Sequence, residues 1–349
     1  MATSDAPRTA SGGAPTGAVN IGVLLPTREQ AITGTFDADP LLQFARTAEE
    51  WGFDSVWTGD SLVARPRLDP LVVLAAAGAA TSRVTLGTAA LTPALRHPLI
   101  GANMLASLDH VCGSRLVLGL GSGFPVPETE AEFAAVGAEF GGRAGRLDEI
   151  TRLWRTAWRS HERGAPTDFE GRYWQAEGLD RLPRTRTPGG PPLWLAGSDT
   201  PRVLARVARE YDGWLPFLPT AAAYGAARRT LAELTVAQGR PADAVTPGFY
   251  ATLTVNDDEE RAKAELEHYV EHYYGRSLEA MATIQAYGWG SPAKCAQWLA
   301  GYVQQGARHI VLRIGSLDPE PQLKQIAEEL LPAVRALGRP GGAGASARS

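Results

Sequence analysis

The chain has 349 residues, of which 44% are hydrophobic, and its formal net charge is −4. This length leaves room for one α/β barrel, which commonly takes about 250 residues, and the apolar fraction is sufficient for a large core. The acidic balance argues against binding to nucleic acid or an anionic membrane, and the longest apolar run, Leu71–Ala80, is only about half as long as a membrane span.

The two ends of the chain are expected to be flexible tails. Residues 1–18 and 338–349 are small, polar and rich in glycine, and the first segment lacks the apolar region of a secretion signal. Cys112 and Cys295 form no CxxC pair or metal cluster, so each is expected to be a buried apolar residue in a reducing cytoplasm. We therefore predict a cytoplasmic protein with one domain at residues 19–337 and no metal.

Between the tails, short apolar strands alternate with amphipathic helices. The strands are predicted at 21–25, 54–57, 84–91, 116–120, 193–196, 213–216, 248–255 and 310–314. The helices are predicted at 40–52, from 70, at 98–113, 128–139 and 143–158, from 201, and at 221–238, 257–274, 292–306 and 319–337. Several strands show no polar alternation, which is typical of parallel sheets covered by helices on both faces.

Eight strand–helix units in series predict a parallel sheet with right-handed crossovers. Closing these units on themselves gives a (β/α)8 TIM barrel, and an open doubly wound sheet is the alternative. Residues 124–192 form an insertion between strands four and five, with two helices and a small hairpin expected around 169–174.

The glycines after the fourth strand resemble a dinucleotide-binding fingerprint. Gly119, Gly121 and Gly123 alternate with other residues, but the final spacing of that motif is missing and Pro125 and Pro127 follow at once. No helix can open on the third glycine, so a Rossmann site is disfavoured. We interpret this segment as a glycine-lined strand end where the backbone lies against a flat ligand.

Five predicted helices begin with a capping residue followed by proline. These pairs are Asp39-Pro40, Asp69-Pro70, Thr200-Pro201, Ser291-Pro292 and Asp318-Pro319. Simple helix initiation explains each pair on its own. In a barrel, however, helices that follow strands begin at the rim where active sites form, and their free N–H groups favour an anion.

The sharpest candidate for an anion site is the segment Gly197–Pro201. Gly197 allows close approach of the backbone, while Ser198 and Thr200 add hydroxyls to the N–H groups of the helix start. This pattern predicts a phosphate site. The alternative is that Thr200 only caps the helix and Ser198 is merely exposed.

Segments spread in order over nearly the whole chain resemble the luciferase-like monooxygenase superfamily. Its members are flavin-dependent barrels related to bacterial luciferase and alkanesulfonate monooxygenase. The segments that carry the resemblance are 57–61, 83–90, 96–98, 108–123, 143–149, 191–197, 212–214 and 290–292. They are specific for the superfamily but not for one reaction.

The resemblance implies a reduced flavin held at the carboxyl ends of the strands. Its phosphate would lie on Ser198 and Thr200 beside Gly197, and its ring against Ala89-Ala90 and Gly121-Ser122. In relatives the bond that matches Ala89-Ala90 is a cis peptide that makes room for the ring. The insertion between strands four and five would help to form the substrate pocket.

Proton handling is where the sequence departs from the family pattern. Many relatives carry histidine after strand two, where this chain has Ser61 beside Asp60. Asp60 could act as a base if the pocket raised its pKa, and His97 lies at a predicted strand-to-helix loop, so Asp60, Ser61 and His97 are the candidate catalytic residues. All three could instead be structural. Arg96 and Arg146 could hold an anionic substrate or the flavin phosphate, or form surface ion pairs.

The leading functional hypothesis is a two-component monooxygenase. It would bind reduced FMN from a separate NAD(P)H-dependent flavin reductase, use O2 to oxygenate a small organic substrate, and form a homodimer. Leu91, Leu120, Phe124 and Trp289 are expected to give the active site an apolar lining, which would exclude water from the flavin hydroperoxide. One alternative is hydride transfer with the deazaflavin coenzyme F420, and another is a catalytically silent flavin-binding barrel.

Overall fold

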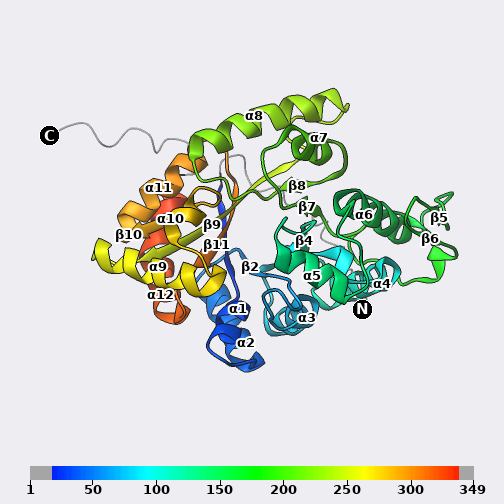
Figure 1. Ribbon diagram of the computed structural model, residues 1–349. Helices are drawn as coiled ribbons and strands as arrows, with labels where there is room; N and C mark the ends of the chain where they lie inside the picture. The colour runs from blue at the N-terminus through cyan, green and yellow to red at the C-terminus, as the bar shows by residue number, and fades with distance from the viewer. Residues whose placement is uncertain (1–17, 338–349) are drawn as a thin grey trace, which may run out of the picture.

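The computed structural model describes residues 18–337 (Figure 1). The predicted tails, apart from Ala18, lie outside the described residues. Within residues 18–337, no helix is both long and apolar enough to cross a membrane. Cys112 and Cys295 are free and buried, as expected.

Eight parallel strands close into a barrel. They are β1 (Asn20–Leu24), β2 (Ser55–Thr58), β3 (Thr85–Leu91), β4 (Leu116–Leu120), β7 (Leu193–Leu195), β8 (Gly213–Trp214), β9 (Thr246–Val255) and β11 (His309–Ile314). The barrel closes because β11 pairs with both β1 and β9, and β8 pairs with β9. This closure confirms the predicted (β/α)8 barrel and rules out the open sheet.

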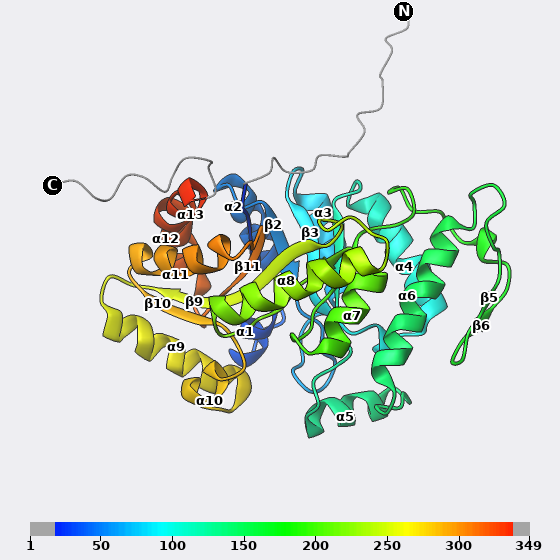
Figure 2. The same ribbon diagram turned by 90° about the horizontal axis from the view of Figure 1, so that it is seen from above.

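Helices surround the barrel and pack on its outer surface (Figures 1 and 2). The main ones are α2 (Ala38–Glu50), α3 (Pro70–Ala80), α4 (Pro98–Val111), α7 (Pro201–Glu210), α8 (Ala221–Ala237), α9 (Glu259–Tyr274), α11 (Pro292–Gln304), α12 (Pro319–Gln325) and α13 (Leu331–Leu337). A π-helical turn, Ile326–Leu330, joins the last two. The apolar stripe of α2 is buried, because residues three and four apart share one helix face; it consists of Leu41, Phe44, Ala45 and Ala48.

The lumen of the barrel contains large side chains that glycines make room for. Trp57 and Trp194 fill it together with Leu215, and a Cβ atom on Gly87 or Gly213 would overlap one of the two indole rings. Alternate strand residues therefore separate two packed regions, one inside the barrel and one between the barrel and its helices.

The segment between β4 and β7 carries additional elements. It forms α5 (Pro127–Ala135), α6 (Arg143–Arg159), the antiparallel pair β5 (Phe169–Glu170) and β6 (Gln175–Ala176), and a 3-10 turn (Leu179–Arg181). Both views show the β5–β6 hairpin at the end of the molecule opposite α9 (Figures 1 and 2). Glu149 on α6 holds the hairpin turn, since its carboxylate accepts hydrogen bonds from the backbone N–H groups of Arg172, Tyr173 and Trp174.

Besides the 3-10 turns at Pro93–Leu95 and Leu179–Arg181, two helices and one strand were not predicted. They are α1 (Thr27–Ile32), α10 (Leu278–Ala282) and β10 (Tyr287–Gly290). β8 and β10 pair with the same edge of β9. β8 pairs with the start of β9, and β10 pairs with its second half. Two of its four residues are glycine, which gives little strand signal in the sequence.

Some helix caps differ from the prediction. Asp39 does not cap α2, because the helix begins at Ala38 and the side chain of Asp37 accepts the N–H of Asp39. Asp318 makes no side-chain cap bond either. Asp69 and Ser291 do cap their helices as expected.

Candidate active site

The ends of β3 and β4 meet closely at the carboxyl-terminal mouth of the barrel. The Ala89–Ala90 peptide bond is cis, as the family resemblance implied. A Cβ atom on Gly121 would lie 3.4 Å from the Cβ of Ala90, and the N–H of Gly121 donates to Leu91 O at 2.8 Å. Three of the four predicted ring-binding residues, Ala89, Ala90 and Gly121, therefore form a surface on which no side chain is longer than a methyl group, and the fourth, Ser122, is half-buried.

The loop after β7 adjoins this surface. Ala196 N–H donates to Leu120 O at 2.8 Å, which places Gly197 beside the end of β4. Thr200 is the N-cap residue of α7, but its side chain makes no cap bond and is exposed, so its hydroxyl is available to a ligand. The structure thus brings Gly197, Ser198 and Thr200 to a helix N-terminus beside Gly121. Cofactor binding by these residues stays a prediction.

Asp60 is held in an ion-pair network. Its carboxylate accepts hydrogen bonds from Arg96 Nη1 at 2.7 Å, Arg96 Nη2 at 3.1 Å and the backbone N–H of Thr92 at 2.9 Å. Arg96 also contacts Asp69 at 2.6 Å. Burial acts to lower the pKa of Arg96, but the bonds and charge of Asp60 outweigh it and the pKa is raised. Asp60 therefore ties the loop after β2 to the loop after β3.

Ser61 is also fully engaged. Its Oγ donates to Glu132 of α5 at 2.8 Å and accepts from Arg65 N–H at 2.8 Å. The same Glu132 oxygen accepts from the backbone N–H groups of Leu62 and Val63. The carboxylate thus fastens α5 to the loop after β2.

His97 and Arg146 each make contacts outside the glycine and alanine surface. His97 is exposed and caps α4, with Nδ1 accepting from Leu99 N–H at 3.3 Å. Arg146 pairs with Glu139 and stacks over the ring of Tyr173 at 4.4 Å. His97 thus has a structural contact at a helix start, and Arg146 has an ion pair, as the alternative interpretations expected. A functional role for either residue remains a prediction.

The expected apolar lining is only partly present. Leu91 and Leu120 are buried in the region between the barrel and its helices, because the alternating residues Ala90 and Gly121 face the mouth. That part of the prediction was wrong. Phe124 is 44% exposed and stacks on Phe217 at 5.7 Å between ring centroids.

A group of arginines and tyrosines at the mouth was missed by sequence reasoning. We define this mouth cluster as Arg67, Tyr250, Tyr273, Tyr274 and Arg313. Arg313 Nη1 donates to Tyr274 Oη at 2.7 Å, and the guanidinium carbon of Arg313 lies 4.5 Å from the ring centroid of Tyr273. An arginine inside the apolar strand β11 was the one available signal.

The mouth cluster shifts the ionisation of its central tyrosine. Burial acts to raise the pKa of Tyr273, but the positive charges of Arg67 and Arg313 outweigh burial and lower it. The opposite end of the lumen holds His309, whose Nε2 lies 2.9 Å from Ser55 Oγ. Burial lowers the pKa of His309 to about 4, against a weaker opposing effect of Asp54, so this histidine is neutral at pH 7.

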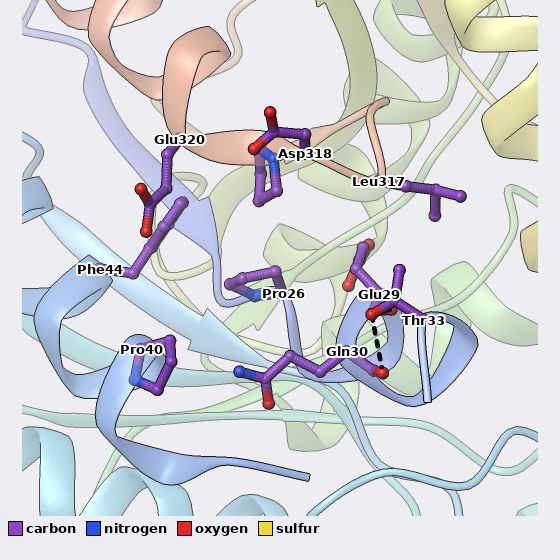
Figure 3. Close-up of a pocket in the computed structure, with 10 residues that line it drawn as sticks. Pro26, Glu29, Gln30, Thr33, Pro40, Phe44, Leu317, Asp318 and Glu320 are labelled. Atoms are coloured by element: carbon purple, nitrogen blue, oxygen red, sulfur yellow. Dashed lines mark hydrogen bonds between the residues drawn. The ribbon is translucent and has the colours of Figure 1, made fainter. Parts of the chain in front are cut away.

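A surface hollow lies beside α1, outside the barrel wall (Figure 3). It is lined by residues of α1, α2 and the start of α12: Pro26, Glu29, Gln30, Thr33, Pro40, Phe44, Leu317, Asp318, Pro319 and Glu320. Three of these are acidic, so the hollow does not suit a phosphorylated cofactor. Among residues 18–337, no group of three or more His, Cys, Asp or Glu side chains could hold a metal ion.

Comparison with known proteins shows the family. A family model described as luciferase-like monooxygenase matches residues 19–309. An F420-dependent glucose-6-phosphate dehydrogenase of Kineococcus radiotolerans is 29% identical over 338 residues, covering 86% of this chain and 94% of the relative. The enzyme of the same name from Rhodococcus erythropolis is 28% identical over 336 residues, covering 87% and 96%.

Two solved structures share the fold. The monooxygenase RslO1 from Streptomyces bottropensis has a TM-score of 0.73 at 23% identity, covering 90% of this chain and 99% of that one. An F420-dependent secondary alcohol dehydrogenase in complex with an F420-acetone adduct has a TM-score of 0.76 at 18% identity, covering 91% and 99%. With a family model matching most of its length, this chain belongs to the luciferase-like monooxygenase family of oxidoreductases.

Proposed function

We propose that the protein is an oxidoreductase that uses coenzyme F420 for hydride transfer to or from a small organic substrate. The observation that carries this proposal is the similarity to enzymes named as F420-dependent, which extends over 94% and 96% of the length of the two relatives described above. An F420-dependent dehydrogenase also has this fold.

The residues at the mouth fit such a cofactor. Ala89, Ala90 and Gly121 offer a flat surface to a ring, and the N-terminus of α7 with Ser198 and Thr200 offers N–H and hydroxyl donors to a phosphate. When bound, the deazaflavin supplies a ring carbon that accepts or returns a hydride without oxygen chemistry. The protein has to position the substrate against that ring and hold the phosphate away from it.

A second candidate is the FMN-dependent monooxygenase, with O2 as co-substrate and a separate flavin reductase as partner. The observation that favours it is the stacked pair of Phe124 and Phe217. An apolar cover over the mouth would exclude water, as oxygenation requires. We carry the homodimer forward as a proposal that light scattering can test.

Turnover under anaerobic conditions tests the leading proposal. The protein is mixed with oxidised F420 and a panel of small alcohols that includes glucose 6-phosphate, and the loss of the visible absorbance of F420 is followed. We expect at least one substrate to reduce the coenzyme. A parallel aerobic reaction supplies reduced FMN and O2 with the same panel. If it forms product while F420 stays oxidised in the anaerobic reaction, the monooxygenase is correct; if neither cofactor turns over with any substrate of the panel, the result favours a catalytically silent barrel.

A further inference from the structure

The mouth cluster carries positive charge without an acidic partner. Arg313 is only 2% exposed, and Arg67 is half-buried. Among residues 18–337, no carboxylate oxygen lies within 4.0 Å of either guanidinium. A buried charge is costly unless it is paired and hydrogen-bonded, so an anion bound beside these two arginines would stabilise them.

Neighbouring residues do not balance this charge. Arg65 stacks over Tyr274 at 5.3 Å, which adds a further cation. Glu29 is the nearby acid, but its Oε1 accepts the hydroxyl of Tyr269 and its Oε2 has no hydrogen-bond partner within the described residues. The negative charge of Glu29 acts on both Arg67 and Arg28. One carboxylate cannot balance Arg65, Arg67 and Arg313 together. Positive charge therefore remains in excess at the mouth.

Hydrogen-bond donors also remain unused. Arg313 has five N–H groups but makes three hydrogen bonds, to Thr252 Oγ1 at 2.9 Å, to Tyr274 Oη, and to Gln285 Oε1 at 3.4 Å. Arg67 donates to Arg65 O at 3.2 Å and to Tyr273 Oη at 3.4 Å. Since a guanidinium presents five donors in a fork that matches carboxylate and phosphate geometry, both side chains can still bind an anion.

The cluster lies beside the expected cofactor surface. A Cβ atom on Gly59 would overlap Arg67 Nη1 and would lie 3.8 Å from Ala89 O, so Arg67 extends over the end of β2 next to the Ala89–Ala90 bond. From there the contacts run through Tyr273 to Arg313 on β11, which pairs with the opposite edge of β1 from β2. An anion bound between the two arginines would therefore lie close to the ring of a bound cofactor.

We propose that Arg67 and Arg313 form a subsite for an anionic group of the substrate, a carboxylate or a phosphate. The assignment to the substrate rests on the proposed function, because it requires a cofactor ring on the neighbouring surface. The tyrosines line the subsite and position the two guanidinium groups.

Anion titration of the full-length protein tests the subsite. Inorganic phosphate and acetate are added in separate calorimetric titrations, with chloride keeping the ionic strength constant. The titrations use Ser198→Ala with Thr200→Ala as background, so that the expected cofactor-phosphate site does not contribute. We expect phosphate or acetate to bind to this protein, and we expect Arg67→Gln and Arg313→Gln each to weaken that binding by at least about tenfold, because each removes a charge-assisted bond. Arg46→Gln on the exposed side of α2 is the matched control and should change nothing.

A second titration identifies the source of the anion. When the wild-type protein is first saturated with F420, which fills the Ser198 and Thr200 site, the binding that depends on Arg67 and Arg313 should keep the affinity of the free protein. Competition would show that acidic groups of the cofactor itself fill the subsite, and would overturn the assignment to substrate. Failure of F420 to bind at all would refute the proposed function without affecting the result for the free protein.

Two results would overturn the subsite itself. One is binding of neither phosphate nor acetate above chloride. The other is equal binding to the background protein and to its Arg67→Gln and Arg313→Gln variants, with each variant shown to be folded by circular dichroism. If Arg313→Gln does not fold, the half-buried Arg67 still provides the test.

Discussion

Replacing Asp60 with asparagine separates a structural from a catalytic role for this carboxylate. Asp60 has a side chain that is 4% exposed, and it accepts three hydrogen bonds, two of them from Arg96. Asparagine keeps one oxygen but turns an amide toward a guanidinium donor. Bonds to charged groups contribute about 1.5–3 kcal/mol and neutral ones about 0.5–1.5 kcal/mol. Because Arg96 retains Asp69, we expect the free energy of unfolding to fall by about 2–4 kcal/mol.

Urea denaturation followed by circular dichroism measures this change. Asp39→Asn is the matched control, since Asp39 is exposed and makes no cap bond through its side chain, and it should stay within about 0.5 kcal/mol of the wild type. The reasoning would be refuted if Asp60→Asn kept wild-type stability and lost about 100-fold or more in turnover, as expected for removal of a general base.

Three further predictions concern single sites. Ser198→Ala combined with Thr200→Ala should weaken cofactor binding by about 1–3 kcal/mol through lost bonds to a charged phosphate, measured by calorimetry; unchanged affinity would place the phosphate elsewhere. Glu132→Ala should destabilise the protein by about 2–4 kcal/mol, since the buried hydroxyl of Ser61 and the loop N–H groups lose their acceptor, whereas the exposed Glu130→Ala should have little effect. His309 has a pKa of about 4 in the folded protein, against 6.5 for an ordinary histidine, so between these pH values an unfolded chain binds a proton that the folded chain does not. The stability that depends on neutral His309, up to about 3 kcal/mol, is complete above pH 6.5 and is lost as the pH falls toward 4. In urea denaturation, His309→Gln should remove this part of the pH dependence, and an unchanged slope would contradict the assignment.

The barrel could be predicted because its signals are local. Each strand is a short apolar run bounded by turn residues, and closure follows from the number of units. β10 was missed because Gly288 and Gly290 weaken its strand signal, and its existence depends on an edge of β9 that only the folded barrel presents. The cap of α2 was misplaced by two residues because Asp37 and Asp39 both satisfy the local pattern.

In the candidate site, too, features with a local sequence signal could be predicted and features that depend on distant contacts could not. The Gly197–Thr200 loop was predicted as a phosphate site from its own residues, and the structure places it at the N-terminus of α7. Two features were not, because they depend on contacts between distant segments: Asp60 meets an arginine 36 residues away, and Arg313 meets Tyr274, 39 residues away. Spacing along the chain gives no sign of such pairs, since the folded barrel alone brings the loops together.

The central claim, use of F420, is tested most directly by comparing cofactor affinities. Equilibrium titration of the same protein preparation with F420 and with FMN, each in oxidised and reduced form, gives the dissociation constants. We predict that F420 binds at least about tenfold more tightly, a difference of about 1.4 kcal/mol, and that this binding is weakened by Ser198→Ala with Thr200→Ala. Tighter binding of FMN in both redox forms would contradict the account.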